Sequence, residues 1–267
     1  MHSDKVRGQA SFFDTFAEKA PEKEEKVVQL PEWPQSELLA AEKELLGFYV
    51  TGHPLTPFVP LLEKYCLHNS ITAAQVPPRQ LTRIGGMIGA VQQGFSKKSG
   101  KPYALITLED LEGAVQVLCF NENFDKFKEL LKTGNAILVI GEVNNDEDKP
   151  KIFPQEIMML EDAPRKYTKQ VHLRLHTSHM TPEKLEEARG LALSHPGKIP
   201  LYLCFRYPTG EAVFLETHEK FWVAPTRQLQ QQADDIFGEE TYYAKVDITM
   251  PEPQKRKWEK RNGDGGE

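Results

Sequence analysis

Cysteine pairs, long hydrophobic runs and an excess of positive charge are all missing from this chain of 267 residues. Its three cysteines, Cys66, Cys119 and Cys204, lie far apart, and none belongs to a CxxC pair. This spacing argues against a disulfide framework and a zinc ribbon, and it fits a reducing cytoplasm. No apolar stretch approaches the roughly 18 residues that a membrane span needs, and the N-terminus has no signal-peptide core. We therefore expect a soluble cytoplasmic protein with no membrane partner.

Catalytic signatures are also missing. There is no Walker loop, no GxGxxG fingerprint and no recognisable set of nucleophile, base and metal ligands. Asp146 and Asp148 suggest a metal-binding pair, but they stand in a polar run typical of a solvated hairpin turn. His172, His176 and His179 have no carboxylate or thiolate near them in the sequence. We predict no catalytic residue, no metal and no cofactor in this chain, and this argues against a hydrolase hidden in its last section.

The net charge of -6 means that any contact with nucleic acid must come from a local basic patch. A hydrophobic fraction of 39% with 27% charged residues suggests globular units joined by polar segments. We predict five sections: a disordered linker at 1–35, a small helical module at 36–78, a β-rich domain at 79–163, an α+β domain at 167–250, and a disordered tail at 251–267.

The section 79–163 contains five predicted strands and one helix. The strands are RIGGMIGAVQQG, PYALITLED, AVQVLCF, AILVIGEV and KIFPQEIMML, and the helix follows the third of them. Three strands, a helix and two strands is the order of an OB-fold, a five-stranded Greek-key barrel. Glycine in the first strand fits, because that strand must bend sharply to serve both halves of the barrel.

The section before this domain is predicted to be helical, and the section after it is predicted to contain both strands and helices. Leucines recur at helical spacing after Ser36, and a second short helix is predicted from Pro57 to Tyr65. The section 167–250 has the order β-α-β-β-α-β, and Pro182 stands at the first position of its first helix. The predicted fold class is therefore multidomain, β-rich plus α+β.

Several stretches carry a resemblance to a known family. They are EKELLGFYVTGHPL (42–55), ALITLEDLEGAVQVLCF (104–120), LLKTGNAILVIGEV (130–143) and HPGKIPLYL (195–203). In these stretches the chain resembles the C-terminal third of the bacterial replicative DNA polymerase III alpha subunit. The resemblance implies that the chain is a fragment or a separately encoded tail of a DNA-directed DNA polymerase, a nucleotidyltransferase. It lacks the family's catalytic palm, so we expect it to be inactive alone, to join the remainder of polymerase III and to act at the nucleoid-associated replisome.

Two adjacent phenylalanines, Phe12 and Phe13, stand in a charged segment with no helical or strand period. They are either stray aromatics of a linker or the anchors of a linear motif that binds a partner. The stretch QASFF is similar to the pentapeptide with which bacterial polymerases hold the sliding clamp (beta), and the resembled family has its internal clamp motif at this position. The resemblance thus implies a clamp-binding site made of Gln9, Ser11, Phe12 and Phe13, with Phe12 where Leu or Met is commoner.

A basic loop between the first two predicted barrel strands is the candidate DNA site. OB-folds bind single strands through such a loop and through the face of strands two and three. The alternative is a solvated hairpin tip with aromatics that pack the barrel. In the resembled family this barrel lies near the single-stranded template. The predicted single-stranded-DNA-binding residues are Arg83, Phe95, Lys97, Lys98, Lys101, Tyr103 and Phe120.

The section 167–250 has no catalytic signature. In the resembled family this end contacts the clamp-loader tau subunit, and we place that contact on the exposed parts of the helix at 227–237 and on the final strand. The competing hypothesis for the whole chain is a stand-alone OB-fold protein that binds single-stranded nucleic acid. Loss of clamp binding on substitution of Gln9 and Phe13 distinguishes the two.

Overall fold

A computed structural model describes residues 33–47, 49–97, 100–144 and 150–251. The chain divides into two compact units, one reaching Thr51 and the other beginning at Gly52. Four groups of sequence predictions lie outside the described residues: the clamp motif at Gln9, Ser11, Phe12 and Phe13; Lys98; the acidic pair Asp146 and Asp148; and most of the two predicted disordered ends.

The described part of the first unit is one helix and the turn after it. Helix α1 runs over Gln35–Leu46 and ends at Gly47, whose φ of 80° is left-handed and suits glycine. The Glu42 carboxylate accepts hydrogen bonds from the backbone N–H of Val50 at 2.7 Å and of Thr51 at 3.1 Å. The bond from Val50 is the main cause of a lowered pKa at Glu42. These bonds hold the turn after α1 against the Glu42 side chain.

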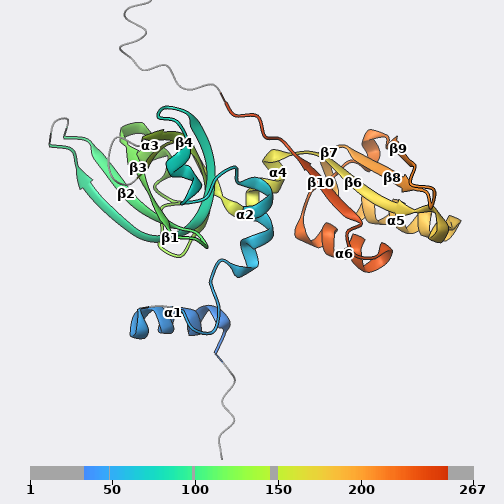
Figure 1. Cartoon of the computed structure of the whole chain (residues 1–267), viewed down its shortest axis with the longest axis horizontal. Coiled ribbons are helices and arrows are strands. Elements are labelled where there is room, and N and C mark those ends of the chain that lie inside the picture. The colour runs from blue at the N-terminus through green and yellow to red at the C-terminus, as the bar shows by residue number, and fades with distance from the viewer. Residues whose placement is uncertain (1–32, 48, 98–99, 145–149, 252–267) are drawn as a thin grey trace, which may run out of the picture. The chain divides into compact units, whose positions relative to one another are not determined.

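The second unit begins with a closed barrel in the order β1-β2-β3-β5-β4, which confirms the predicted five-stranded fold (Figure 1). The helix α3 (Asn121–Phe127) stands between β3 and β4, as predicted. The strands are β1 (Leu81–Phe95), β2 (Pro102–Glu109), β3 (Ala114–Phe120), β4 (Ala136–Asn144) and β5 (Lys151–Met159).

Strand β1 closes the barrel because it pairs with two partners. Its first half, as far as Met87, pairs with β4, and its second half pairs with β2. The register shifts between Ile88 and Ala90, so Gly89 is at the bend. At Gly86 a Cβ would lie 2.5 Å from the carbonyl oxygen of Glu109. The glycines therefore permit the bend and the close backbone approach, as the sequence pattern predicted.

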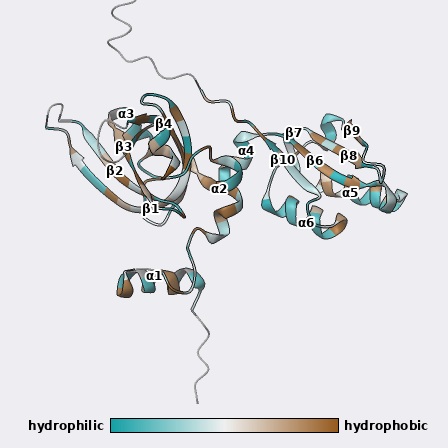
Figure 2. Ribbon diagram, viewed as in Figure 1, coloured by the Kyte–Doolittle hydropathy of each residue, from teal (hydrophilic) through white to brown (hydrophobic). Residues whose placement is uncertain are grey.

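Alternation along β2 and β3 fills the barrel interior. Figure 2 shows hydrophobic and hydrophilic residues interspersed along these strands. Phe127 of α3 and Leu131 beyond it cover one end of the same core. Burial raises the pKa of the Cys119 thiol to about 12, so this cysteine is an inert core residue. The buried residues from β2 and β3 are Ala104, Ile106, Leu108, Val115, Val117 and Cys119.

The helical stretch before the barrel packs on its outside. Helix α2 (Val59–Tyr65) contributes Leu62 and Tyr65 to a cluster with Leu138 of β4 and Leu160. A one-turn helix, η3 (Thr72–Gln75), follows it. Residues 52–78 therefore share a core with the barrel. Of the residues predicted as a helical module, those up to Thr51 belong to the first unit, and the described residues from Leu55 onward supply the apolar side chains of this cluster.

The section after the barrel forms a four-stranded sheet in the order β10-β6-β8-β9, in which β6 and β8 are parallel. The predicted β-α-β-β-α-β order is present, with one addition: the short strand β7 (Pro196–Ile199), which the sequence pattern missed. The remaining elements are β6 (Thr168–His176), α5 (Pro182–Ser194), β8 (Leu201–Arg206), β9 (Ala212–Glu216), α6 (Arg227–Phe237) and β10 (Tyr242–Val246).

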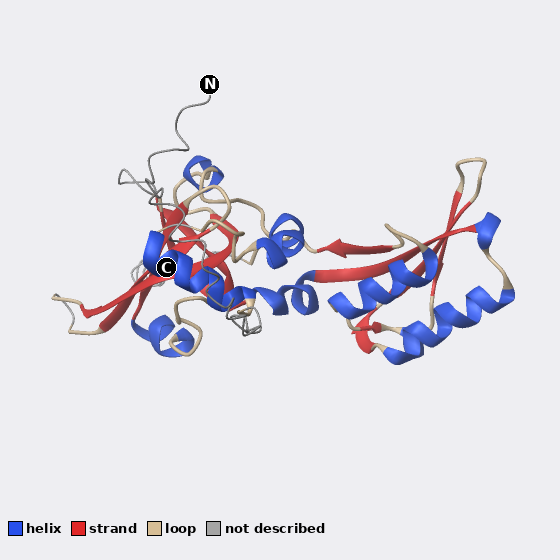
Figure 3. Ribbon diagram, turned by 90° about the horizontal axis from the view of Figure 1, so that it is seen from below, coloured by secondary structure: helices blue, strands red, loops and turns tan. Residues whose placement is uncertain are grey.

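Both long helices of this section lie on the same side of the sheet (Figure 3). The hydroxyl of Thr181 caps α5 and that of Thr226 caps α6, each by accepting a backbone N–H. Leu191 of α5 and Leu229 of α6 pack on Leu173 of the central strand β6. The opposite face of the sheet carries no helix of this section. Of the described helices, none is long and apolar enough to cross a membrane.

Candidate nucleic-acid interface

The loop between β1 and β2 is a tight, basic hairpin tip. The backbone N–H of Ser96 donates to the carbonyl of Lys101 at 2.9 Å, and that of Gly100 donates to the carbonyl of Ser96 at 2.8 Å. Gly100 has a φ of 65°, which the turn requires and glycine supplies. Lys97 and Lys101 are exposed. The paired strands carry this tip outward from the barrel (Figure 1), so its lysines are accessible to an anionic ligand.

Three rings lie in a row on the outer face of the barrel, across β2, β3 and β5. Tyr103 and Phe120 are cross-strand partners, with ring centroids 6.0 Å apart. Phe120 and Phe153 are stacked at 6.2 Å with an interplanar angle of 17°. We refer to these three residues as the aromatic row. Phe120 is 38% exposed, so one part of the row faces solvent.

Strand geometry explains why the row forms. Ala104 and Cys119 point into the barrel, so their neighbours Tyr103 and Phe120 point out. Tyr103 pairs with Gly94 of β1, and a Cβ at Gly94 would lie 2.9 Å from the Tyr103 hydroxyl oxygen. The missing side chain therefore lets the tyrosine ring lie across β1, close to the basic tip.

Phe95 does not join the aromatic row. It pairs with Pro102, the neighbour of Tyr103, and therefore lies on the opposite face of the hairpin. Its side chain is 75% exposed. The structure thus brings together Tyr103 and Phe120 from the predicted set and separates Phe95 from them.

Phe153 is the ring that the sequence prediction missed. Alternation in the fifth strand, with Ile152 buried, carries the signal that Phe153 faces outward. Its position next to Phe120 depends on the parallel pairing of β3 with β5, where Val117 is opposite Ile152. That pairing joins segments far apart in the chain, so local patterns do not reveal it.

Arg83 is not part of this interface, which corrects the sequence prediction. Its side chain is fully buried, and its guanidinium lies 4.3 Å from the ring centroid of Tyr167. Its Nη1 donates to the carbonyl of Asp247 at 2.9 Å. Burial lowers the pKa of Arg83. A phosphate cannot reach the Arg83 guanidinium, because the side chain is buried against Tyr167 and Asp247.

Between the aromatic row and the far end of β2, the outward-facing side chains of β2 and β3 are uncharged. They are Leu105, Thr107, Gln116 and Leu118, and Glu109 stands only at the strand end. Lys151 of β5 lies opposite Gln116. One carboxylate stands beside the row, since Glu142 of β4 is the cross-strand partner of Phe153. Flat rings with lysines near them form a surface on which bases can stack while phosphates contact ammonium groups.

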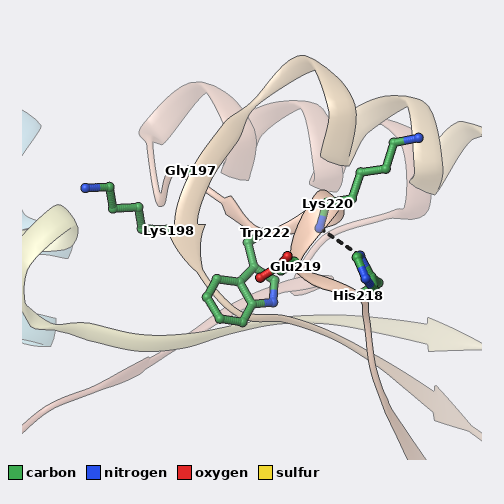
Figure 4. Close-up of a pocket in the computed structure, with 6 residues that line it drawn as sticks. All are labelled: Gly197, Lys198, His218, Glu219, Lys220 and Trp222. Atoms are coloured by element: carbon green, nitrogen blue, oxygen red, sulfur yellow. Dashed lines mark hydrogen bonds between the residues drawn. The ribbon is translucent and has the colours of Figure 1, made fainter.

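The last section also has a shallow hollow that is lined by charged and aromatic side chains (Figure 4). Lys198, Lys220 and Trp222 line it together with Glu219 and His218, whose Nδ1 accepts the backbone N–H of Lys220 at 3.2 Å. Two lysines and one glutamate thus share the rim of this hollow with a single ring and a histidine. Within the described ranges, no group of three or more His, Cys, Asp or Glu residues could hold a metal ion.

Comparison with known proteins agrees with this architecture. Residues 82–160 match the family described as an OB-fold nucleic acid binding domain. The chain is 26% identical over 239 residues to the DNA polymerase III subunit alpha of Pasteurella multocida, covering 88% of this chain and 20% of that protein. The corresponding protein of Vibrio cholerae is 27% identical over 240 residues, covering 89% of this chain and 20% of that protein.

The chain therefore spans about a fifth of the length of these curated relatives. Among solved structures, the second OB-fold domain of replication protein A from Methanococcus maripaludis has a TM-score of 0.27 and 20% identity, covering 33% of this chain and 91% of that chain. Residues 82–160 thus form an OB-fold domain, and most of the chain is similar to one part of a DNA polymerase III alpha subunit.

Proposed function

We propose that this chain is a C-terminal accessory part of a bacterial DNA polymerase III alpha subunit, and that its barrel binds single-stranded template DNA. The observation that carries the proposal is the aromatic row of Tyr103, Phe120 and Phe153 beside the lysine hairpin. The similarity to polymerase III alpha subunits over most of the chain supports it. DNA synthesis itself belongs to the remainder of the polymerase, in the cytoplasm at the replisome.

The binding mode follows from the chemistry of the surface. Bases stack on the rings whatever their identity, because every base presents a π-face. Lys97, Lys98 and Lys101 neutralise phosphates, which releases counterions and makes the affinity depend on salt. Neither interaction reads a sequence. The barrel therefore holds whichever template segment passes it.

Replacing Phe120 and Phe153 together by alanine is expected to weaken the binding of a fluorescent oligo(dT) by about 2 kcal/mol or more, because each stacked base contributes roughly 1–3 kcal/mol. Phe120 is exposed and Phe153 half-buried, so the barrel interior stays intact. Fluorescence anisotropy measures the affinity. Tyr207→Ala is the matched control, since this ring is 45% exposed and lies in the turn between β8 and β9.

The contribution of the lysines is tested by the salt dependence of the affinity rather than by the affinity at one salt concentration. Replacing Lys97, Lys98 and Lys101 by serine should reduce the slope of log K against log salt by about 2, at about 0.7 per phosphate for a single strand. The slope is measured with the same oligo(dT) between low and moderate salt. An unchanged slope, or an aromatic variant that binds like the control, contradicts the barrel assignment.

The second element of the proposal is a tether to the sliding clamp through Gln9, Ser11, Phe12 and Phe13. Replacing Gln9 and Phe13 by alanine is expected to abolish capture of the chain on immobilised clamp, because a few anchor side chains carry most of the binding energy of such peptides. Surface plasmon resonance measures the capture. Phe16→Ala, a third phenylalanine of the same segment, is the control. Capture that survives the double substitution argues for the alternative, a stand-alone single-strand-binding protein.

The remaining elements of the proposal concern arrangement and partners. We assign 36–78 as a helical module, 79–163 as the OB domain and 167–250 as a docking domain for the clamp-loader tau subunit. The tau contact is placed on the exposed residues of α6 and on β10. Several weak tethers, to DNA, clamp and tau, would together hold the polymerase at the primer terminus through their effective concentration.

A further inference from the structure

The helix-free face of the second sheet carries an aromatic cluster that the barrel proposal does not use. His172 lies at its centre, on the inner strand β6, and its ring stacks on Tyr202 with centroids 5.1 Å apart and an interplanar angle of 16°. Phe214 and Tyr243 each contact His172 edge-on at 5.9 Å. Phe214 is 60% exposed and Tyr243 40% exposed. We refer to His172, Tyr202, Phe214 and Tyr243 as the open-face cluster.

Strand register places the cluster across all four strands. Tyr243 of β10 pairs with His172 of β6, and His172 pairs with Tyr202 of β8. Phe214 of β9 pairs with Cys204, two residues beyond Tyr202 on the same face. The helices α5 and α6 pack on the alternate residues, which face the other way. The rings therefore form a continuous platform with no helix of this section over it.

Cations surround the platform. The Arg174 guanidinium lies 4.1 Å from the Tyr243 ring centroid, and the Lys64 ammonium lies 5.6 Å from it. Arg206 and Lys245 stand on the same face of β8 and β10, by strand alternation from Tyr202 and Tyr243.

A carboxylate stands on the same face of the sheet as these cations. It is Glu216, opposite Tyr202, and a hydrogen bond to it raises the pKa of Tyr202. Burial and the charges of Lys245 and Arg174 lower the pKa of His172, so its imidazole is neutral at neutral pH. A surface with four cations, one anion and a neutral stacking ring is complementary to a polyanion that also presents flat bases.

We infer that the open-face cluster is a second binding surface for single-stranded DNA, separate from the barrel. A four-stranded sheet with exposed rings stacks bases on its face, and flanking Arg and Lys side chains hold the phosphates. Phe214 and Tyr243 provide the stacking surfaces, and Arg174 and Lys64 provide the phosphate contacts at the Tyr243 end. This inference does not depend on the barrel proposal, because it uses none of the same residues.

The test measures oligo(dT) binding by the full chain, both unsubstituted and with Phe120→Ala and Phe153→Ala. In the Phe120→Ala, Phe153→Ala background, the further change Phe214→Ala, Tyr243→Ala is expected to weaken the remaining affinity by roughly tenfold or more. Irradiation of a bromodeoxyuridine oligonucleotide should crosslink peptides that contain Phe214 or Tyr243. Tyr207→Ala and Arg189→Ala are matched controls, since both side chains are exposed and neither is on the open face.

The outcomes separate the two surfaces. Binding that depends on the open-face pair but not on the barrel pair rejects the barrel proposal and keeps this inference. Binding that the barrel substitutions abolish, or that the open-face substitutions leave unchanged, overturns this inference. Crosslinks confined to barrel peptides also overturn it, and a protein partner then becomes the better occupant of the face.

Discussion

Replacing Gly86 by alanine is expected to destabilise the barrel by about 3 kcal/mol or more. The added Cβ would lie 2.5 Å from the carbonyl oxygen of Glu109 and 3.0 Å from the Leu108 side chain. The backbone of β2 cannot withdraw locally, because Met87, next along β1, pairs with both Glu109 and Ala136. Over-packing of a core typically costs 1–3 kcal/mol, and a clash with backbone lies at or above the upper end.

Urea unfolding followed by tryptophan fluorescence and by circular dichroism measures this effect. Gly190→Ala is the matched control, because Gly190 lies inside α5 and an added Cβ there meets no atom within 4 Å. That substitution should stabilise the protein by about 0.5–1 kcal/mol, since alanine is the better helix former. Equal unfolding midpoints for Gly86→Ala and the unsubstituted protein would contradict the close approach of β1 and β2.

Replacing Arg83 by alanine is expected to cost about 3 kcal/mol. Arg83 is among the largest fully buried side chains, and its removal leaves a cavity under Tyr167. The carbonyl of Asp247 also loses its donor at 2.9 Å. Because Asp247 follows β10 while Arg83 stands on β1, the loss should loosen the link between barrel and second sheet. Differential scanning calorimetry measures the change in the unfolding free energy, and a shared link predicts that both parts unfold at lower temperature.

Arg83→Met tells whether charge or volume matters at this position. Two buried nitrogens of Arg83, Nε and Nη2, have no hydrogen-bond partner among the described residues. Methionine keeps the length and apolar contact with Tyr167 and removes those unpaired donors, so the expected loss is only about 1 kcal/mol. If methionine is as damaging as alanine, then the guanidinium charge itself holds the two parts together.

The alternation of small and branched residues made most of the barrel predictable. Ala104 and Ile106 on β2, and Val115 and Val117 on β3, recur every second residue, and each is buried. The capped start of α5, with Thr181 and Pro182, was equally clear because local chemistry alone decides it. Where neighbouring residues alone determine a structural element, the sequence pattern is sufficient to predict it.

The errors arose where distant segments meet. Arginine on a strand is ordinarily exposed, so the burial of Arg83 against Tyr167 was not visible in its own neighbourhood. Phe153 became part of the aromatic row only through the parallel β3–β5 pairing. The strand β7 contains Pro196 and Gly197, which are poor strand residues, and it pairs only through isolated bridges to Val223. Each case depends on a contact between residues far apart in the sequence.

The way the barrel closes has a consequence for how it responds to a ligand. Among the described residues, strands β3 and β5 share two paired positions, Gln116 with Lys151 and Val117 with Ile152, which is fewer than any other pair of neighbouring strands in the barrel has. Phe120 and Phe153 stack across the same junction. A nucleotide bound to both rings would contact β3 and β5 together. Because it would bind only the closed barrel, its binding would stabilise the closed barrel against opening at this junction. Nucleotide binding and the stability of the closed barrel are therefore coupled at the β3–β5 junction.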